Sequence, residues 1–523
     1  MQKKRLAIGT MVLLWMSGIC FLFLFSYMTS PLFPWAYGWD AAFFQLVGSG
    51  MTKGYLPYRD FYDMKGPWLF FIEYAGQRLW YGKTGIFILQ CASLCTVLFL
   101  AQATYWKYFK DRVKSHGSSG INSVVKTNLV SIVSSLAMVL PLYIVLSATM
   151  EGGNLTEEWS LPFLFWPMYL SLDFIKSEAK EHKPLYGFVY GTCFGVIALI
   201  RITNAVMICA IVLTIMIYLI KDRQWKNLWR NAGAFVLGVA VAFVPPLFYF
   251  GYFGEIGSML ACVFVFGFLY GTEGFQIGTG GIYLLVLLFP ILIFILTKQV
   301  NKRLWTLVLA NAAGMMITLG MGNSTLHDYM LVIPGMMFGV WRLFEAWQSV
   351  TECHDEATDG AWKGLSGQKT GKRYGRMGKG MGMALIVAII LCFAYPCYKM
   401  AGAGALAYRQ FGNDSAYQNV METVACIPEE ERGSVWGYEA PLRWYTIADI
   451  MPYHRYCGWQ EHYMALSKQI ASEIEEMLES CPPEWIVTKK EAAIENAIVR
   501  EKLQEDYAPA MENGEYRLYQ RKS

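Results

Sequence analysis

The chain has 523 residues, of which 55% are apolar and 16% charged, and its mean hydropathy is +0.32. Soluble domains carry about 25% charged residues, so this composition argues against an ordinary soluble enzyme and excludes a disordered or collagen-like chain. The formal charge of +4 hides an asymmetry: residues 403–523 carry 12 Lys and Arg against 20 Asp and Glu, whereas residues 1–402 carry 32 against 20. This division predicts a membrane domain over 1–402 and a solvated domain over 403–523, and it gives no support to nucleic-acid binding.

Eleven apolar runs are candidates for membrane-spanning helices, each of which needs about 20 apolar residues. They lie near 6–28, 85–105, 127–149, 159–175, 184–200, 203–220, 232–252, 277–297, 304–321, 329–346 and 381–400. The first run is too long for the core of a signal peptide and lacks a clear cleavage site, so we expect it to be retained as the first span. The two short runs on either side of Arg201 fit either two spans or one bent helix over 184–220.

Lys and Arg are distributed unevenly over the connections between these runs. If the N-terminus is cytoplasmic, the inner connections hold 25 basic residues, and the outer connections hold five, all within residues 29–84. Because basic loops stay in the cytoplasm, the sequence predicts a multi-pass membrane protein with a cytoplasmic N-terminus and with residues 403–523 outside the cell.

The C-terminal region alternates strand-like and helical patterns. The strand-like runs are Ser434–Tyr438, Trp485–Thr488 and Tyr516–Tyr519, and the helical runs are 461–480 and 490–505. These patterns predict a small α/β domain. Three of the twelve cysteines lie in this region, and no CxxC or Cys/His ligand spacing occurs in the chain, so we expect inert thiols rather than a zinc site or a disulfide framework.

Residues 29–84 form the longest predicted outer connection. Loops of this length are functional or disordered, and the ten aromatic residues between Phe33 and Tyr62 argue against disorder. The end of this connection, residues 66–80, predicts an amphipathic helix lying along the outer interface. Asp40 follows the first span at the start of a short helical pattern, where a carboxylate either caps the helix N-terminus or acts as a general base near the membrane surface.

The pattern Asp40…Gly54…Pro57-Tyr-Arg-Asp60…Asp63-Met-Lys65-Gly-Pro67 resembles the membrane glycosyltransferases of the GT-C superfamily. It is most similar to bacterial relatives of the protein O-mannosyltransferases and to the lipid A aminoarabinose transferases. The resemblance implies a polytopic α-helical fold of about 11 transmembrane helices with a small extracytoplasmic α/β domain, located in the bacterial plasma membrane.

By the same resemblance, a sugar passes from a polyprenyl-phosphate-linked donor to a cell-envelope acceptor on the outer face of the membrane, with inversion at the anomeric carbon. Asp40 is then the catalytic base. Unlike a glycosidase, which uses two carboxyl groups, such an enzyme needs cations for its phosphate leaving group.

The resemblance assigns the donor phosphate to Lys65, Arg201 and His327. Arg201 either meets the lipid phosphate or ends a span as a snorkelling residue. His327 either contacts the phosphate or a cation, or is an ordinary surface residue. Met64 and Ala41 stand where many relatives have acids, so the sequence offers no clear ligand set for a divalent cation and leaves the cofactor open.

Five further residues are candidates for substrate binding or for support of the site: Tyr58, Asp60, Asp63, Glu157 and Glu158. Asp60 and Asp63 either supply a second carboxylate or pair with neighbouring cations. Glu157 and Glu158 open a span, where acids stabilise a helix N-terminus; alternatively, one of them binds a sugar hydroxyl or a metal.

The main alternative to a glycosyltransferase is a transporter or lipid flippase. Transporters place ionisable residues near the bilayer midplane and often contain inverted repeats, whereas these predicted spans are nearly free of charge and show no internal repeat. A membrane scaffold would leave the charged outer connection unexplained. No P-loop or Rossmann fingerprint offers a site for a nucleotide donor. The sequence does not identify the sugar or the acceptor, which could be a wall polymer, a lipid, a glycan or a protein.

Overall fold

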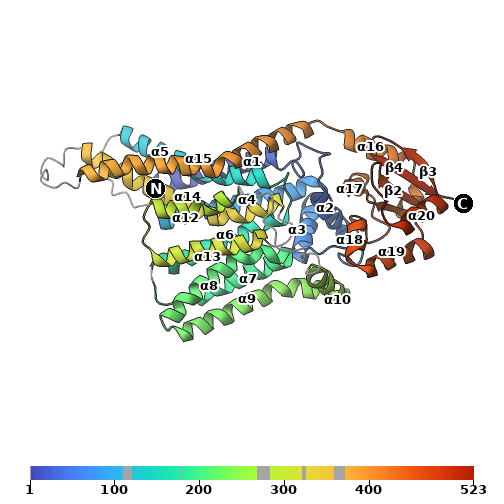
Figure 1. Cartoon of the computed structure of the whole chain (residues 1–523), viewed down its shortest axis with the longest axis horizontal. Helices are drawn as coiled ribbons and strands as arrows, with labels where there is room; N and C mark the ends of the chain where they lie inside the picture. The colour runs from blue at the N-terminus through green and yellow to red at the C-terminus, as the bar shows by residue number, and fades with distance from the viewer. Residues whose placement is uncertain are drawn as a thin grey trace.

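The computed structural model describes residues 2–109, 121–177, 179–267, 283–320, 325–358 and 371–522. Figure 1 shows a bundle of long helices with a smaller α/β domain at one end, where the chain terminates. We call this end of the bundle the domain end and the opposite end the far end.

The long helices of the bundle follow the predicted apolar runs. They are α1 (Gln2–Phe25), α4 (Lys83–Thr104), α5 (Ile121–Thr149), α6 (Thr156–Ser177), α7 (Pro184–Arg201), α8 (Val206–Lys221), α9 (Trp225–Tyr252), α12 (Tyr283–Leu296), α13 (Lys302–Gly320), α14 (Ile333–Thr358) and α15 (Gly371–Gln410). Within the described ranges, seven stretches are long and apolar enough to cross a membrane, the longest being Pro184–Lys221. A polytopic helical membrane protein is therefore confirmed, whereas the number of about 11 spans is not.

The segment around Arg201 forms two helices rather than one bent span. A Cβ atom on Gly191 of α7 would lie 1.9 Å from the carbonyl oxygen of Phe235 in α9, and one on Gly187 would lie 3.0 Å from that of Asn231. These close approaches pair α7 and α9 in the same direction, as small residues permit between membrane helices. Because only three residues separate α8 from α9, α8 must return to the end at which α7 began. The reversal occurs in the 3₁₀ turn η2 (Ile202–Ala205).

The predicted outer connection between α1 and α4 is a folded layer at the domain end. It contains α2 (Trp39–Thr52), which is buried from Ala41 to Met51, and α3 (Pro67–Leu79), which corresponds to the predicted interfacial helix. The side-chain nitrogen of Lys83 donates to the backbone carbonyls of Phe33 and Ala36, each at 2.6 Å. Buried hydrogen bonds to backbone carbonyls are costly to break, so the beginning of this layer is fixed to α4. Farther along the chain, α10 (Ile256–Leu260) and the π-helical turn η3 (Ala261–Phe266) follow α9.

The α/β domain contains a four-stranded sheet in the order β1-β2-β4-β3. Its elements are α16 (Ser415–Ala425), η7 (Glu429–Ser434), β1 (Val435–Tyr438), α17 (Arg443–Ala448), α18 (Gln460–Leu466), α19 (Lys468–Ser480), β2 (Trp485–Lys489), α20 (Ala497–Asp506), β3 (Tyr507–Glu512) and β4 (Tyr516–Arg521). β1 and β2 are parallel, and the other two pairs are antiparallel. The three predicted strands are confirmed as β1, β2 and β4. β3 escaped prediction because it is mostly exposed and contains Pro509, so it lacks the alternation that marks a strand.

The α/β domain rests directly on the layer formed by α2 and α3. The side chain of Lys53 pairs with Asp449 at 2.7 Å, and the hydroxyl of Thr446 donates to the backbone carbonyl of Ala42 at 3.0 Å. Buried residues of α2, α3, β1, β2 and β4 also belong to one hydrophobic cluster. The domain is therefore part of the same folded unit as the candidate site.

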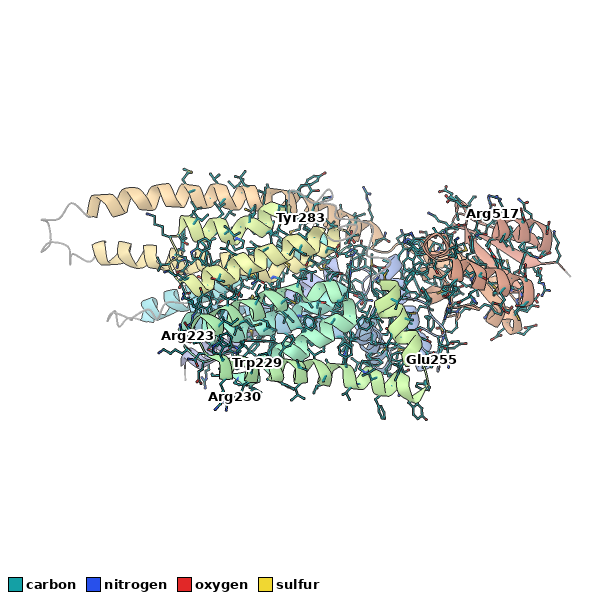
Figure 2. All side chains as sticks on the ribbon, turned by 60° about the horizontal axis from the view of Figure 1, so that its bottom comes forward. Arg223, Trp229, Arg230, Glu255, Tyr283 and Arg517 are labelled. Atoms are coloured by element: carbon teal, nitrogen blue, oxygen red, sulfur yellow. The ribbon has the colours of Figure 1, made fainter. Side chains whose placement is uncertain are left out.

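Figure 2 places Arg223, Trp229 and Arg230 at the far end, with Glu255 at the domain end and Arg517 in the α/β domain. Trp229 is 72% exposed, which is typical of tryptophan at a membrane–water interface.

Candidate functional site

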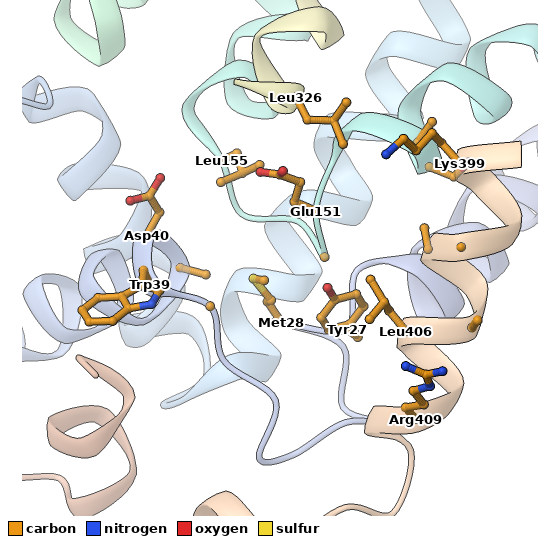
Figure 3. Close-up of a pocket in the computed structure, with 18 of the residues that line it drawn as sticks. Tyr27, Met28, Trp39, Asp40, Glu151, Leu155, Leu326, Lys399, Leu406 and Arg409 are labelled. Atoms are coloured by element: carbon orange, nitrogen blue, oxygen red, sulfur yellow. The ribbon is translucent and has the colours of Figure 1, made fainter. Parts of the chain in front are cut away.

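A cavity of about 860 Å³ opens at the domain end of the bundle, between the start of α2, the segment before α6 and the last turns of α15 (Figure 3). Its lining includes four charged residues and two tryptophans, namely Asp40, Glu151, Lys399, Arg409, Trp39 and Trp459. A volume of this size can hold a substantial ligand. Of the charged lining residues, the sequence had identified only Asp40.

Asp40 lies in the first turn of α2 and lines the cavity directly. Gly38 occupies the N-cap position, so the interpretation of Asp40 as the N-cap is wrong. Figure 3 shows its side chain projecting from the start of the helix, across the cavity from Glu151. Within the part of the chain that the structure describes, the Asp40 carboxylate accepts no hydrogen bond and forms no ion pair. Its carboxylate is thus open to a ligand in the cavity.

Arg201, at the end of α7, is held by two acids from distant parts of the chain. Its Nη1 donates to Glu157 at 2.5 Å and to Asp328 at 2.9 Å. The side chains of these acids are 1% and 9% exposed, so the carboxylate side of the ion pairs is largely shielded from water. Arg201 is therefore paired, and it does not end its span as a snorkelling residue.

His327, in the 3₁₀ helix η5 (Leu326–Val332), connects this ion-paired cluster to the cavity. Its Nδ1 lies 2.8 Å from a carboxylate oxygen of Glu151, and its Nε2 lies 2.8 Å from the hydroxyl of Thr325. Burial opposes the charged imidazole, but the hydrogen bond to Glu151 and the nearby charges of Glu157 and Asp328 outweigh it and raise the pKa of His327 to about 9. At neutral pH His327 is therefore a cation that positions Glu151.

Glu157, His327 and Asp328 form one candidate metal-ligand set in the described ranges, with ligand atoms within 4.8 Å of one another. Both carboxylates already accept hydrogen bonds from Arg201. A divalent cation would have to displace this guanidinium, and His327 would have to lose its proton to coordinate it. The arrangement fits an arginine-bridged cluster better than a metal centre.

Asp63 and Lys65 lie beside the cavity residue Asp40 without lining the cavity themselves. Asp63 is 3% exposed, and its carboxylate accepts a hydrogen bond from the backbone N–H of Lys65 at 3.1 Å. Burial raises the pKa of Asp63, the charge of Lys65 lowers it, and the charge of Asp40 raises it again. The backbone N–H of Gly66 donates to the carbonyl of Ile200 at 2.9 Å, which sets this segment against the end of α7. The charge of Asp40 therefore acts both on Asp63 and on Arg201, and Lys65 interacts with Asp63 in the same segment.

Tyr58, Asp60 and Glu158 make supporting contacts. The hydroxyl of the fully buried Tyr58 donates to the Lys65 carbonyl at 2.8 Å. Asp60 accepts from the backbone of Leu56 and pairs with its neighbour Arg59. Buried Glu158 accepts hydrogen bonds from the Gln90 side chain and from the backbone N–H of Asn154. These three side chains shape the loops around the site and do not line the cavity.

Lys399 and Arg409 supply cavity cations that the sequence reasoning missed. Both project from α15 in Figure 3, on the wall across from Asp40. Neither forms an ion pair with a carboxylate among the described residues, so their charge is not compensated locally. Their position could have marked them as candidates, because Lys399 and Arg409 lie at and just after the end of the last predicted span, near 381–400. The prediction places this end outside the cell, where basic residues are less common.

No protein-family model matches the chain, and no curated protein matches it. Two solved structures are similar to the chain over nearly its whole length. The crystal structure of ArnT from Cupriavidus metallidurans bound to undecaprenyl phosphate superposes with a TM-score of 0.58 and 12% sequence identity, covering 97% of each chain. The apo state of the same protein gives a TM-score of 0.57 at 12% identity, covering 98% of each chain. The resemblance predicted from the outer connection is thus confirmed at the level of the fold, because the chain is folded like the ArnT structures over nearly its whole length.

Proposed function

We propose that the protein is a glycosyltransferase of the bacterial plasma membrane that moves a sugar from a polyprenyl-phosphate-linked donor to a cell-envelope acceptor. The observation that carries this proposal is the cavity at the domain end, lined by the unpartnered carboxylate of Asp40. The fold supports it, because the similar ArnT structure is described as bound to undecaprenyl phosphate.

In the proposed reaction a hydroxyl group of the acceptor attacks the anomeric carbon of the donor sugar. Asp40 accepts the hydroxyl proton as the new C–O bond forms, and the bond from the anomeric carbon to the phosphate oxygen breaks with its electron pair on phosphate. The configuration of the sugar is inverted. One base suffices, because the phosphate leaves as a stable anion and needs no proton from an acid.

Positive charge near the cavity suits that leaving group. Lys399 and Arg409 lie on the wall opposite Asp40, and we propose that they attract the anionic donor into the cavity. Lys65, whose charge acts on Asp63, is the proposed contact to the donor phosphate. Cations that face a developing phosphate charge in a partly dehydrated site stabilise it strongly.

Arg201 and His327 take a positioning role in this proposal. Each is already bound to a carboxylate, Arg201 to Glu157 and Asp328, and His327 to Glu151. These pairs fix the segment before α6 and the start of η5, which form the part of the cavity wall that faces Asp40.

The test is transfer of radiolabelled sugar from polyprenyl-phosphate donors in membranes that contain the wild-type chain or Asp40→Asn. General-base catalysis contributes about 100-fold to 10,000-fold, so we expect Asp40→Asn to lose at least about 100-fold in rate at equal protein level. The matched control is Asp414→Asn, an exposed aspartate of the α/β domain, which should transfer at the wild-type rate. Normal transfer by Asp40→Asn would eliminate Asp40 as the base. Movement of the lipid across the membrane without any sugar transfer would instead favour a flippase.

A further inference from the structure

We propose that Trp39 and Trp459 form a platform on which the sugar ring of the lipid-linked donor stacks, so that the C-terminal domain completes the sugar subsite. This inference rests on the proposed function and adds to it a specificity element that involves two parts of the chain 420 residues apart.

Both tryptophans line the cavity, and their rings lie together. The ring centroids are 5.7 Å apart and the ring planes are inclined by 38°. Trp39 is 42% exposed, so part of its ring is accessible to a ligand. The two rings are thus neighbouring aromatic groups in the cavity lining.

The platform lies next to the proposed base. Trp39 immediately precedes Asp40 on α2, and Figure 3 shows the indole beside the Asp40 side chain. In the proposed reaction the anomeric carbon of the donor must lie near this carboxylate. A sugar ring in that position would be within reach of the indole faces.

An indole ring and a sugar ring are chemically complementary. The face of an indole ring carries negative electrostatic potential, and the C–H groups on one face of a pyranose ring carry a small positive charge. Stacking therefore buries the apolar face of the sugar and leaves its hydroxyl groups free for polar contacts. A bare lipid phosphate has no such face and gains nothing from the platform.

The backbone of Trp459 supports a role beyond filling space. Its φ of +55° and ψ of +33° lie in the left-handed region, which is costly for a bulky residue and occurs preferentially at ligand sites. The following residue, fully buried Gln460, maintains this geometry through hydrogen bonds to the carbonyls of Gly437 and Tyr456 and from the backbone N–H of Glu439. The domain thus holds a large aromatic ring at the cavity despite an unfavourable backbone.

A purely structural role for Trp459 is the competing explanation, because its ring also packs near Phe43 and Tyr463. Other contacts, such as Lys53 with Asp449, already attach the domain to α2. The test must therefore separate sugar recognition from domain attachment.

The experiment compares two affinities of the full-length chain in nanodiscs prepared without sugar-based detergents. The ligands are undecaprenyl phosphate and a panel of its glycosylated forms carrying glucose, galactose, mannose or N-acetylglucosamine. The measured quantity is the ratio of the two dissociation constants, bare over glycosylated, for the best-bound sugar. A residue that only attaches the domain changes both affinities together, whereas a sugar platform changes the ratio.

We expect the wild-type ratio to be roughly fivefold to tenfold, as aromatic stacking energies allow, and to fall close to one in Trp459→Ala and Trp39→Ala. Trp459→Phe, which keeps an aromatic face, should retain part of the ratio. The control is Trp80→Ala, since Trp80 is 63% exposed and does not line the cavity; it should behave as the wild type.

Three results would overturn the inference: a wild-type ratio of one across the panel, a ratio unchanged in both alanine variants, or an equal loss of both affinities together with increased proteolysis of the α/β domain. Failure of the proposed function has a different signature. A chain that shows the expected ratios but transfers no sugar would retain the platform and would not be a glycosyltransferase.

Discussion

Replacing Arg201 with glutamine should destabilise the protein through the acids that it leaves behind. In the native structure one guanidinium nitrogen donates to both Glu157 and Asp328. Glutamine keeps polar character but is shorter and carries no charge. Glu157, with a side chain only 1% exposed, would then be a buried carboxylate beside a second acid, with only the charge of the nearby His327 imidazolium to offset it.

The magnitude follows from the burial of each partner. Removing one member of a buried ion pair costs about 3–5 kcal/mol, and we take the lower end, about 3 kcal/mol, because the Arg201 side chain is 32% exposed and water screens the pair in part. Extrapolating from the smaller shift per kcal/mol in larger proteins gives a decrease in Tm of roughly 4 °C for this chain.

The assay is thermal unfolding of the detergent-purified full-length chain at one fixed scan rate, because membrane proteins of this size unfold irreversibly. The double variant Arg201→Gln/Glu157→Gln removes the stranded buried charge and should recover at least half of the lost Tm. Arg78→Gln, at an exposed arginine of α3, is the control and should leave Tm unchanged. A Tm of Arg201→Gln within 1 °C of the wild type, or a double variant less stable than the single one, would refute the reasoning.

Two further predictions concern titration and metal dependence. Burial raises the pKa of Glu73 to about 8, and the nearby Asn154 amide opposes this rise without reaching hydrogen-bond geometry. Since the folded state keeps a proton that the unfolded chain releases above about pH 4.3, stability should fall as pH rises from about 4.5 to 8. Tm measured over this range should fall less in Glu73→Gln than in the wild type or in the exposed control Glu479→Gln, and parallel profiles would contradict the assignment. Because Arg201 already occupies the two carboxylates of the candidate metal set, transfer activity should persist after EDTA treatment; a loss that Mn²⁺ or Mg²⁺ restores would show that a metal replaces this ion pair.

The membrane architecture could be predicted because it depends on local composition. A spanning helix must be apolar over a continuous stretch, and α1, α4, α9 and α13 show this directly. The number of spans was harder to predict, because α6 contains two prolines and opens with Glu157 and Glu158, which lower its hydropathy below that of an isolated span. The reversal after Arg201 depends on close packing between α7 and α9 and is not encoded in either run alone.

The candidate site was only partly predictable, because a local sequence pattern does not show which distant segments come into contact. Asp40 stands out locally, as a carboxylate following the first span in a loop rich in aromatic residues. Its neighbours in the cavity do not, because Glu151, Lys399 and Trp459 lie in three separate parts of the chain. Each is unremarkable in its own segment, and only the fold brings them together.

The sequence by itself determined the polytopic helical class, the folded outer connection and the α/β character of the C-terminal region, because hydropathy and side-chain periodicity act over a few turns or one strand. The tertiary structure alone decided how the charges are paired and what surrounds Asp40. Arg201 meets acids 44 and 127 residues away, and Trp459 reaches the cavity because the α/β domain rests on α2. Such contacts between distant segments follow from helix packing and domain attachment, which no local pattern specifies.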